Sequence, residues 1–158
     1  MVGRPPPASD AETRRRMLHQ RRSDTGPERA VRRVLARLGH RFRLANSDLP
    51  GSPDIANRSK RWAVFVHGCF WHRHAECPRA TVPKRNRVWW EAKFRDNQQR
   101  DTRKAQALQS AGYRVVIVWE CETRDVNALE RKLARAFPSR SRPPRRSAPP
   151  ARPRPTPT

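Results

Sequence analysis

Apolar positions recur with helical spacing in two stretches of the chain. In front of the first stretch, Thr25-Gly-Pro-Glu28 supplies an N-cap, a first-turn proline and the acid of a capping box, and Gly39 follows as a stop. Intervals of three and four residues place the apolar side chains of each stretch on one face. We therefore expect two amphipathic helices, with apolar faces formed by Val31, Val34, Leu35 and Leu38 in one and by Val126, Leu129, Leu133 and Phe137 in the other.

Continuous apolar runs at residues 62–66 and 114–119 are typical of buried strands. A shorter alternating pattern around residues 42–44 predicts a half-buried strand. A turn rich in Pro and Gly precedes an extended segment that begins at Asp54. If this segment forms a hairpin with the run at 62–66, Asp54 lies near His67 in space.

Residues 88–110 have mostly helical character, and Gly112 provides the stop. The strongly charged middle of this stretch, residues 95–104, favours a break into two helices. The resulting order of helix, strands, helix, strand and helix is typical of a single α/β domain with a mixed sheet. We place this domain at residues 24–137.

The two ends of the chain have compositions that cannot build a core. We interpret residues 1–23, which are polar and basic, as a flexible arm. Residues 138–158 contain eight Pro and six Arg and no acid. We expect them to form a disordered basic tail that adds non-specific affinity for DNA.

The charge of the chain indicates a polyanionic partner. Its 158 residues include 36 Lys and Arg against 14 Asp and Glu, a formal net charge of +22. Nucleic acid is the partner that such a charge most often indicates, and a basic surface without a specific partner is the alternative. No apolar run approaches the ~20 residues of a membrane span, and the charged, Pro-rich start does not read as a signal peptide. We therefore expect a cytoplasmic protein with no membrane partner.

The three Cys and nearby His residues indicate a metal site. An odd number of Cys disfavours a disulfide framework and favours metal binding in a reducing compartment. Three thiolates and one imidazole form a closed tetrahedral set for structural zinc. The alternative is three free buried thiols and a surface His, and both His67 and His72 compete with His74 for the fourth place. The predicted zinc ligands are Cys69, His74, Cys77 and Cys121.

Asp54 is the candidate ligand for a second, catalytic metal. Mg2+ prefers oxygen ligands, and the Asp54 carboxylate, the Val66 backbone carbonyl and water would supply them. His67, His72 and Glu28 would position water, and a His beside that water can act as a general acid or base in phosphodiester hydrolysis. The alternative is that Asp54 only forms the turn.

The adjacent aromatics Phe70 and Trp71 lie in a polar, His-rich loop, where a large apolar pair indicates contact with a partner. Trp62, Trp89 and Trp119 lie in or beside apolar runs, and we expect them in the core.

Several motifs between about Asp24 and Cys121 resemble those of the very short patch repair endonucleases. The most specific is His67-Gly-Cys-Phe-Trp-His72. The others are Leu49-Pro-Gly-Ser-Pro-Asp54, Trp90-Glu-Ala-Lys93, Asn97, Arg100-Asp101 and Gly112-Tyr-Arg-Val-Val-Ile-Val-Trp-Glu-Cys121.

This resemblance implies a restriction-endonuclease-like fold, a structural zinc and Mg2+-dependent nicking of double-stranded DNA. The family cuts 5′ of the T in a T:G mismatch left by deamination of 5-methylcytosine. It also implies a bacterial, nucleoid-associated monomer with mismatch-repair proteins as further partners. The implied site residues are Asp54 as metal-binding carboxylate, His72 as catalytic His, His67 and Glu28 as water-positioning groups, Cys69, His74, Cys77 and Cys121 as zinc ligands, and Phe70, Trp71 and Trp90 as the wedge that enters the base stack.

The chain departs from the family pattern at two points. Val66 stands where Thr is expected, and the His74–Cys77 spacing is one residue longer. Two further interpretations stay open from the sequence: a zinc-stabilised DNA-binding module without catalysis, and a restriction-system nuclease of the same fold that acts on paired DNA.

Overall fold

A computed structural model describes residues 7, 11–19 and 23–138 of the chain. About half of the predicted arm and nearly all of the predicted tail lie outside the described residues, so the flexibility of both remains a prediction. Within the described part of the arm, Ala11–Leu18 form a short helix. None of the helices within the described ranges is long and apolar enough to cross a membrane.

The sheet is mixed and has the strand order β1-β2-β3-β4. β1 (Arg43–Leu44), β2 (Ile55–Asn57) and β3 (Trp62–His67) pair antiparallel in sequence order, and β4 (Arg114–Trp119) pairs parallel with β3. The two apolar runs therefore form the parallel pair. β3 lies inside the sheet and is buried as predicted, whereas β4 lies at the sheet edge and is mostly half-buried. This confirms the α/β domain with a mixed sheet.

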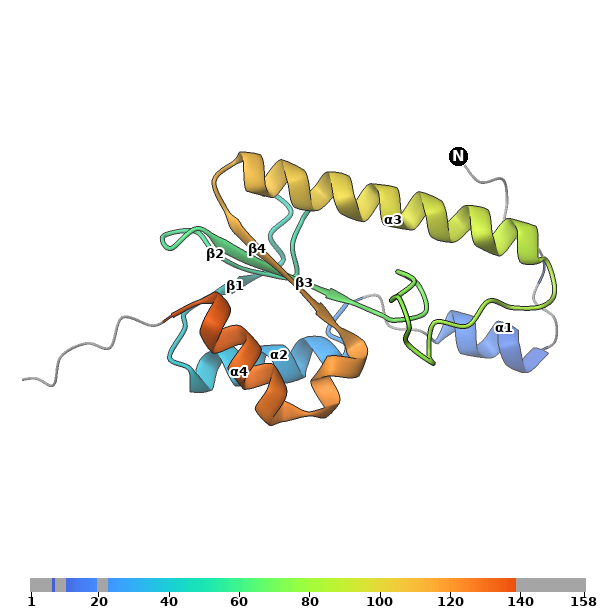
Figure 1. Ribbon diagram of the computed structural model, residues 1–158, viewed down its shortest axis with the longest axis horizontal. Helices are drawn as coiled ribbons and strands as arrows, with labels where there is room; N and C mark the ends of the chain where they lie inside the picture. Colours follow the sequence, from blue (N-terminus) through green and yellow to red (C-terminus); the bar gives the residue numbers. More distant parts are fainter. Residues whose placement is uncertain (1–6, 8–10, 20–22, 139–158) are drawn as a thin grey trace, which may run out of the picture.

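Helices cover both faces of this sheet (Figure 1). α3 (Arg87–Ser110) lies on one face, while α2 (Gly26–Arg37) and α4 (Val126–Ala136) lie on the other. A 3-10 turn, η1 (Glu120–Arg124), connects β4 to α4, and a short helix, α1 (Ala11–Leu18), precedes the sheet. At the start of α2 the Thr25 hydroxyl accepts a hydrogen bond from the Glu28 amide, which confirms the predicted cap.

Alternation along β3 divides the core between the two faces. Trp62 and Val64 pack with α2 and α4, whereas Ala63 and Phe65 pack in a second cluster with Leu108 of α3. Successive side chains of a strand point to opposite faces. The last residue of β3, His67, therefore shares the face of Phe65 and lies under α3.

The predicted break in the helix at 88–110 is wrong, because α3 is one helix of 24 residues. Its buried residues Trp90, Phe94, Asn97 and Leu108 recur at helical intervals along one side. The Arg side chains between them lie on the exposed side, whereas Asp101 lies on the buried side. One buried position, Asn97, is thus hidden in a stretch of sequence with a polar pattern.

Candidate catalytic and metal sites

The candidate sites lie where the two parallel strands end together. His67 at the end of β3 pairs with Trp119 at the end of β4. The loop 68–77 and η1 continue from these two ends. Carboxyl ends of parallel strands are a common location for ligand sites in α/β domains.

The antiparallel register brings Asp54 to the end of β3. Ile55 pairs with Val64, so Asp54 lies one step further along, opposite Phe65 and next to Val66. The Val66 amide donates a 2.7 Å hydrogen bond to Asp54 Oδ2. The predicted proximity of this carboxylate to the end of the strand is confirmed.

The environment of Asp54 disfavours its charge. Burial raises the pKa of this carboxyl, and the nearby Glu28 carboxylate raises it further. The Val66 amide, Lys104 and His72 lower the pKa in the opposite direction. A partly buried carboxylate that is held near a second acid is one that a bound cation would stabilise.

Two His and one Asp form a compact cluster next to Asp54. The rings of His67 and His72 stack with centroids 4.0 Å apart and planes 7° from parallel. His72 Nδ1 lies 2.5 Å from Asp101 Oδ2, and the three residues are arranged so that one ligand atom of each falls within 4.8 Å of the others. We call His67, His72 and Asp101 the histidine–aspartate cluster.

The protonation states within this cluster differ. Burial lowers the pKa of His67 to about 4, with His72 and Lys104 acting in the same direction and Asp101 against them. Burial tends to raise the pKa of Asp101, but the hydrogen bond with His72 and nearby positive charge produce a net lowering. At neutral pH His67 is therefore neutral and Asp101 is ionised.

Glu28 lies at the edge of the site and is held by local contacts. Its carboxylate accepts hydrogen bonds from the Asp24 amide, at 3.0 Å, and from the Thr25 hydroxyl, at 2.9 Å. Arg32 adds an ion pair at 3.2 Å. The contacts of the Glu28 carboxylate are those of a capping box, and it influences Asp54 through charge.

The structure brings the four predicted zinc ligands together. His74 Nδ1 lies 3.3 Å from Cys121 Sγ and 3.7 Å from Cys69 Sγ. Ligand atoms of all four residues fall within 4.8 Å of one another. Zn–N and Zn–S bonds of about 2.0 and 2.3 Å in a tetrahedron give N–S edges of about 3.6 Å, so the spacing fits. We call Cys69, His74, Cys77 and Cys121 the cysteine–histidine cluster.

The thiols of this cluster have unequal affinity for protons. Burial raises the pKa of Cys69 to about 12, and the neighbouring sulfurs of Cys121 and Cys77 contribute in the same direction. A hydrogen bond from the Arg79 backbone amide lowers the pKa of Cys77. A divalent cation bound by the sulfurs would favour the thiolate form of each. No disulfide joins the three Cys.

The predicted wedge residues form one aromatic cluster against α3. The Phe70 ring lies 5.1 Å from Trp71, 5.5 Å from Trp90 and 5.3 Å from Phe94, between centroids. Phe70 and Trp71 are half-buried, and Trp90 is 8% exposed. Among the Trp residues expected in the core, Trp62 is buried, while Trp89 and Trp119 are half-buried.

Sequence reasoning assigned no role to Asp101 and Asn97. The Asn97 side-chain amide donates to the Trp71 carbonyl at 2.9 Å and so fixes the loop that carries His72. Asp101 follows Asn97 by one helical turn on the same side of α3. The signal in the sequence is the run of intervals of three and four residues that joins both positions to the buried stripe of Trp90 and Phe94.

Comparison with known proteins agrees with this geometry. A family model described as DNA mismatch endonuclease Vsr matches residues 8–79. The type II nicking enzyme V.XorIIP of Xanthomonas oryzae pv. oryzae is 49% identical over 123 residues, which cover 77% of this chain and 90% of that protein. The type II nicking enzyme V.NmeAIP of Neisseria meningitidis is 35% identical over 119 residues, with 75% and 84% covered. The DNA mismatch endonuclease Vsr of Escherichia coli is 41% identical over 101 residues, 64% of each chain.

Fold, site and relatives together define the class of protein as a DNA endonuclease, a hydrolase that acts on DNA. The chain belongs to the Vsr family of DNA mismatch endonucleases.

Proposed function

We propose that this endonuclease nicks DNA 5′ of the T in a T:G mismatch that arises from deamination of 5-methylcytosine, with Mg2+ as cofactor, and so initiates very short patch repair. The observation that carries the proposal is the convergence of Asp54, held by the Val66 amide, with the histidine–aspartate cluster at the end of β3.

Asp54 and Val66 would hold the Mg2+. In a strand the N–H and C=O of one residue point to the same edge, so the Val66 carbonyl points toward the edge where its amide meets Asp54. An ionised carboxylate has about four acceptor positions, and the amide uses one of them. A replacement of Thr by Val at this position leaves the backbone carbonyl unchanged. When bound, the metal would stabilise the charge that develops on the scissile phosphate.

His72 is the proposed general base. The ionised Asp101 carboxylate can only accept a hydrogen bond, so its contact with His72 Nδ1 requires the proton on that nitrogen. Nε2 is then left to take a proton from the attacking water. His67, which is neutral and stacked on His72, would position this water, and Glu28 would favour the metal through its negative charge.

Phe70, Trp71 and Trp90 are the proposed wedge beside the mismatch. Phe70 and Trp71 lie on the loop that also carries His72. Insertion of these aromatic side chains into the stacked bases would therefore be coupled to placement of His72 at the DNA backbone. Selection of the mismatch then follows from its lower cost of unstacking. The net charge of +22 would add affinity for phosphates without selecting a sequence.

Zinc is the proposed occupant of the cysteine–histidine cluster, with a structural role. Four protein ligands close the tetrahedron and leave no position for water. This cluster joins the loop after β3 to η1 after β4, through Cys121. The metal would thus hold the two strand ends in register. We propose that the enzyme acts as a monomer on double-stranded DNA and that mismatch-repair proteins are its partners.

A nicking assay tests the proposed function. Duplexes labelled on the T strand, one with T:G and one with T:A in a panel of flanking sequences, are incubated with Mg2+ or with EDTA. We expect nicking 5′ of the T only with T:G and Mg2+. Equal cutting of T:A would instead support a restriction-type nuclease, and binding without cutting would support a DNA-binding module. Asp48→Asn, in the turn before Asp54, is the matched control for Asp54→Asn.

A further inference from the structure

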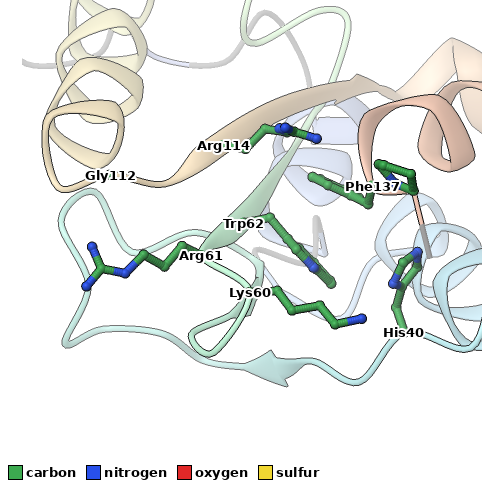
Figure 2. Close-up of a pocket in the computed structure, with 8 residues that line it drawn as sticks. His40, Lys60, Arg61, Trp62, Gly112, Arg114 and Phe137 are labelled. Carbon is green, nitrogen blue, oxygen red and sulfur yellow. The ribbon is translucent and has the colours of Figure 1, made fainter. Parts of the chain in front are cut away.

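A cavity of about 310 Å³ lies at the start of β3, at the opposite end from His67. The five residue steps from Trp62 to His67 correspond to roughly 16 Å along the strand. The cavity is therefore separate from the cluster at the end of β3. Residues from four segments line it, including His40, Lys60, Arg61, Trp62, Arg114 and Phe137 (Figure 2).

Positive charge dominates the lining of this cavity. Lys60, Arg61 and Arg114 contribute cations, and no Asp or Glu is among the lining residues. Figure 2 shows Lys60 extending toward His40, with Arg114 near Phe137. Arg114 Nη1 donates to the Ala136 carbonyl at 2.6 Å, which holds the guanidinium at the end of α4. Arg61 extends away from the other side chains in Figure 2, which leaves Lys60 and Arg114 as cations with no acidic residue beside them among the described lining residues. Such a lining favours an anion.

Buried donors without partners point into the same region. His40 is 6% exposed, and no described residue hydrogen-bonds either ring nitrogen with good geometry, although the Phe137 carbonyl lies near enough to act on the ring. The indole nitrogen of Trp62, which is 3% exposed, also has no partner among the described residues. A buried polar group left unsatisfied costs about 1–3 kcal/mol, so a ligand with acceptor atoms in this cavity would be stabilised by these groups.

The electrostatics of His40 agree with this inference. Burial lowers the pKa of His40, and the positive charge of Lys60 lowers it further, while the Phe137 carbonyl raises it. A bound anion would reverse the effect of Lys60 and accept a hydrogen bond from the imidazole. The aromatic wall is preformed, since Trp62 stacks on Phe137 at 4.5 Å and His40 meets Trp62 edge-on at 5.7 Å.

We propose that this cavity binds the phosphate group of a small ligand of mononucleotide size, with Lys60, His40 and the Trp62 indole as the groups that recognise it. The volume is about ten times that of a water molecule in the liquid, which leaves room for a phosphate with an attached organic group. The residues that follow Pro138 carry six Arg and no acid, so they have the same positive charge as the cavity lining. Like charges repel, which disfavours this segment as the occupant of the cavity. The site is distinct from the proposed nicking site, and its test is independent of nicking.

Titration calorimetry of the full chain in EDTA, with thymidine 5′-monophosphate as probe, tests this site. We expect saturable binding that inorganic phosphate competes with, and no binding of uncharged thymidine. Lys60→Ala and His40→Leu should each weaken binding about tenfold or more, ~1.4 kcal/mol. Lys84→Ala, another exposed Lys remote in sequence from the cavity, is the matched control and should change binding by less than about twofold.

Two further readouts separate recognition from folding. His40→Leu removes two unpaired buried nitrogens, so its thermal midpoint should equal or exceed that of the natural chain. Nicking by Lys60→Ala and His40→Leu should remain at the natural level. Equal binding of thymidine and its monophosphate, no saturable binding at millimolar concentration, or equal weakening by Lys84→Ala would each overturn the proposal.

Discussion

The histidine–aspartate cluster and the cysteine–histidine cluster are interleaved in one loop but differ in what they offer a metal. Residues 67 and 72 belong to the first, whereas 69, 74 and 77 belong to the second. The first has nitrogen and carboxylate groups near the Asp54 carboxylate. The second has three sulfurs and one nitrogen, a set that fills a tetrahedral site. Residues 67–77 thus contribute to both the proposed catalytic site and the proposed structural site.

A change of backbone direction separates the two clusters. Arg73, between His72 and His74, has a φ of 51°, which is uncommon for a residue with a side chain. The loop therefore sends His72 toward Asp101 on α3 and His74 toward Cys121 after β4. This comparison shows why residue spacing alone could not divide the three His between the sites.

The largest effect on the proposed catalytic site is expected from Asp54→Asn. The substitution removes the charge that would hold Mg2+ and keeps the shape of the side chain. Single-turnover nicking of a T:G duplex should fall about 10³-fold or more, ~4 kcal/mol. DNA affinity in EDTA should stay within about threefold. Full activity in this variant would show that the metal is held elsewhere.

For the closed site, the corresponding change is Cys121→Ser, which removes the ligand supplied from η1. Because structural zinc binding is coupled to folding, we expect loss of the copurified metal and a fall in unfolding free energy on the order of 3 kcal/mol. Metal analysis and denaturation measure these. Thr123→Ser, in the same 3-10 turn, is the control. A natural chain that is active with no zinc, against an expected value of about one per chain, would contradict the assignment.

Asp101→Asn tests whether the histidine–aspartate cluster acts through the tautomer of His72. An amide can donate as well as accept, so it no longer requires the proton on Nδ1. We expect nicking to fall about 10²-fold, with DNA binding and zinc content unchanged. Asp48→Asn should leave the rate unchanged.

Much of this arrangement follows from the sequence. The amphipathic helices, the two apolar strands and the hairpin at Asp54 follow from the spacing of apolar and turn-forming residues within short segments of the sequence. The three Cys of the cysteine–histidine cluster follow from ligand type and number, whereas spacing alone left His67 and His72 as alternatives to His74. The role of Asp101 and the continuity of α3 depend on contacts between distant segments. A polar residue that packs under a loop has the same local pattern as one that faces water.

A smaller effect is expected from acid, which should lower the free energy of unfolding through His67 of the histidine–aspartate cluster. The pKa of His67 is about 4 in the folded chain, below its ordinary value of 6.5. The unfolded chain thus takes up a proton that the folded chain does not. This contribution to stability is complete above pH 6.5 and is lost as pH falls toward 4, on the order of 2 kcal/mol. Denaturation at pH 7.5 and pH 5 should show a weaker pH dependence in His67→Gln than in the natural chain.

The central claim is that two metals have separate roles, and one measurement tests it most directly. The purified protein is treated briefly with EDTA and desalted, and zinc content and T:G nicking are measured on the same sample before and after Mg2+ is added. The account predicts about one zinc retained per chain, no nicking after EDTA, and full recovery with Mg2+ alone. Recovery that requires zinc, or nicking that persists in EDTA, would contradict it.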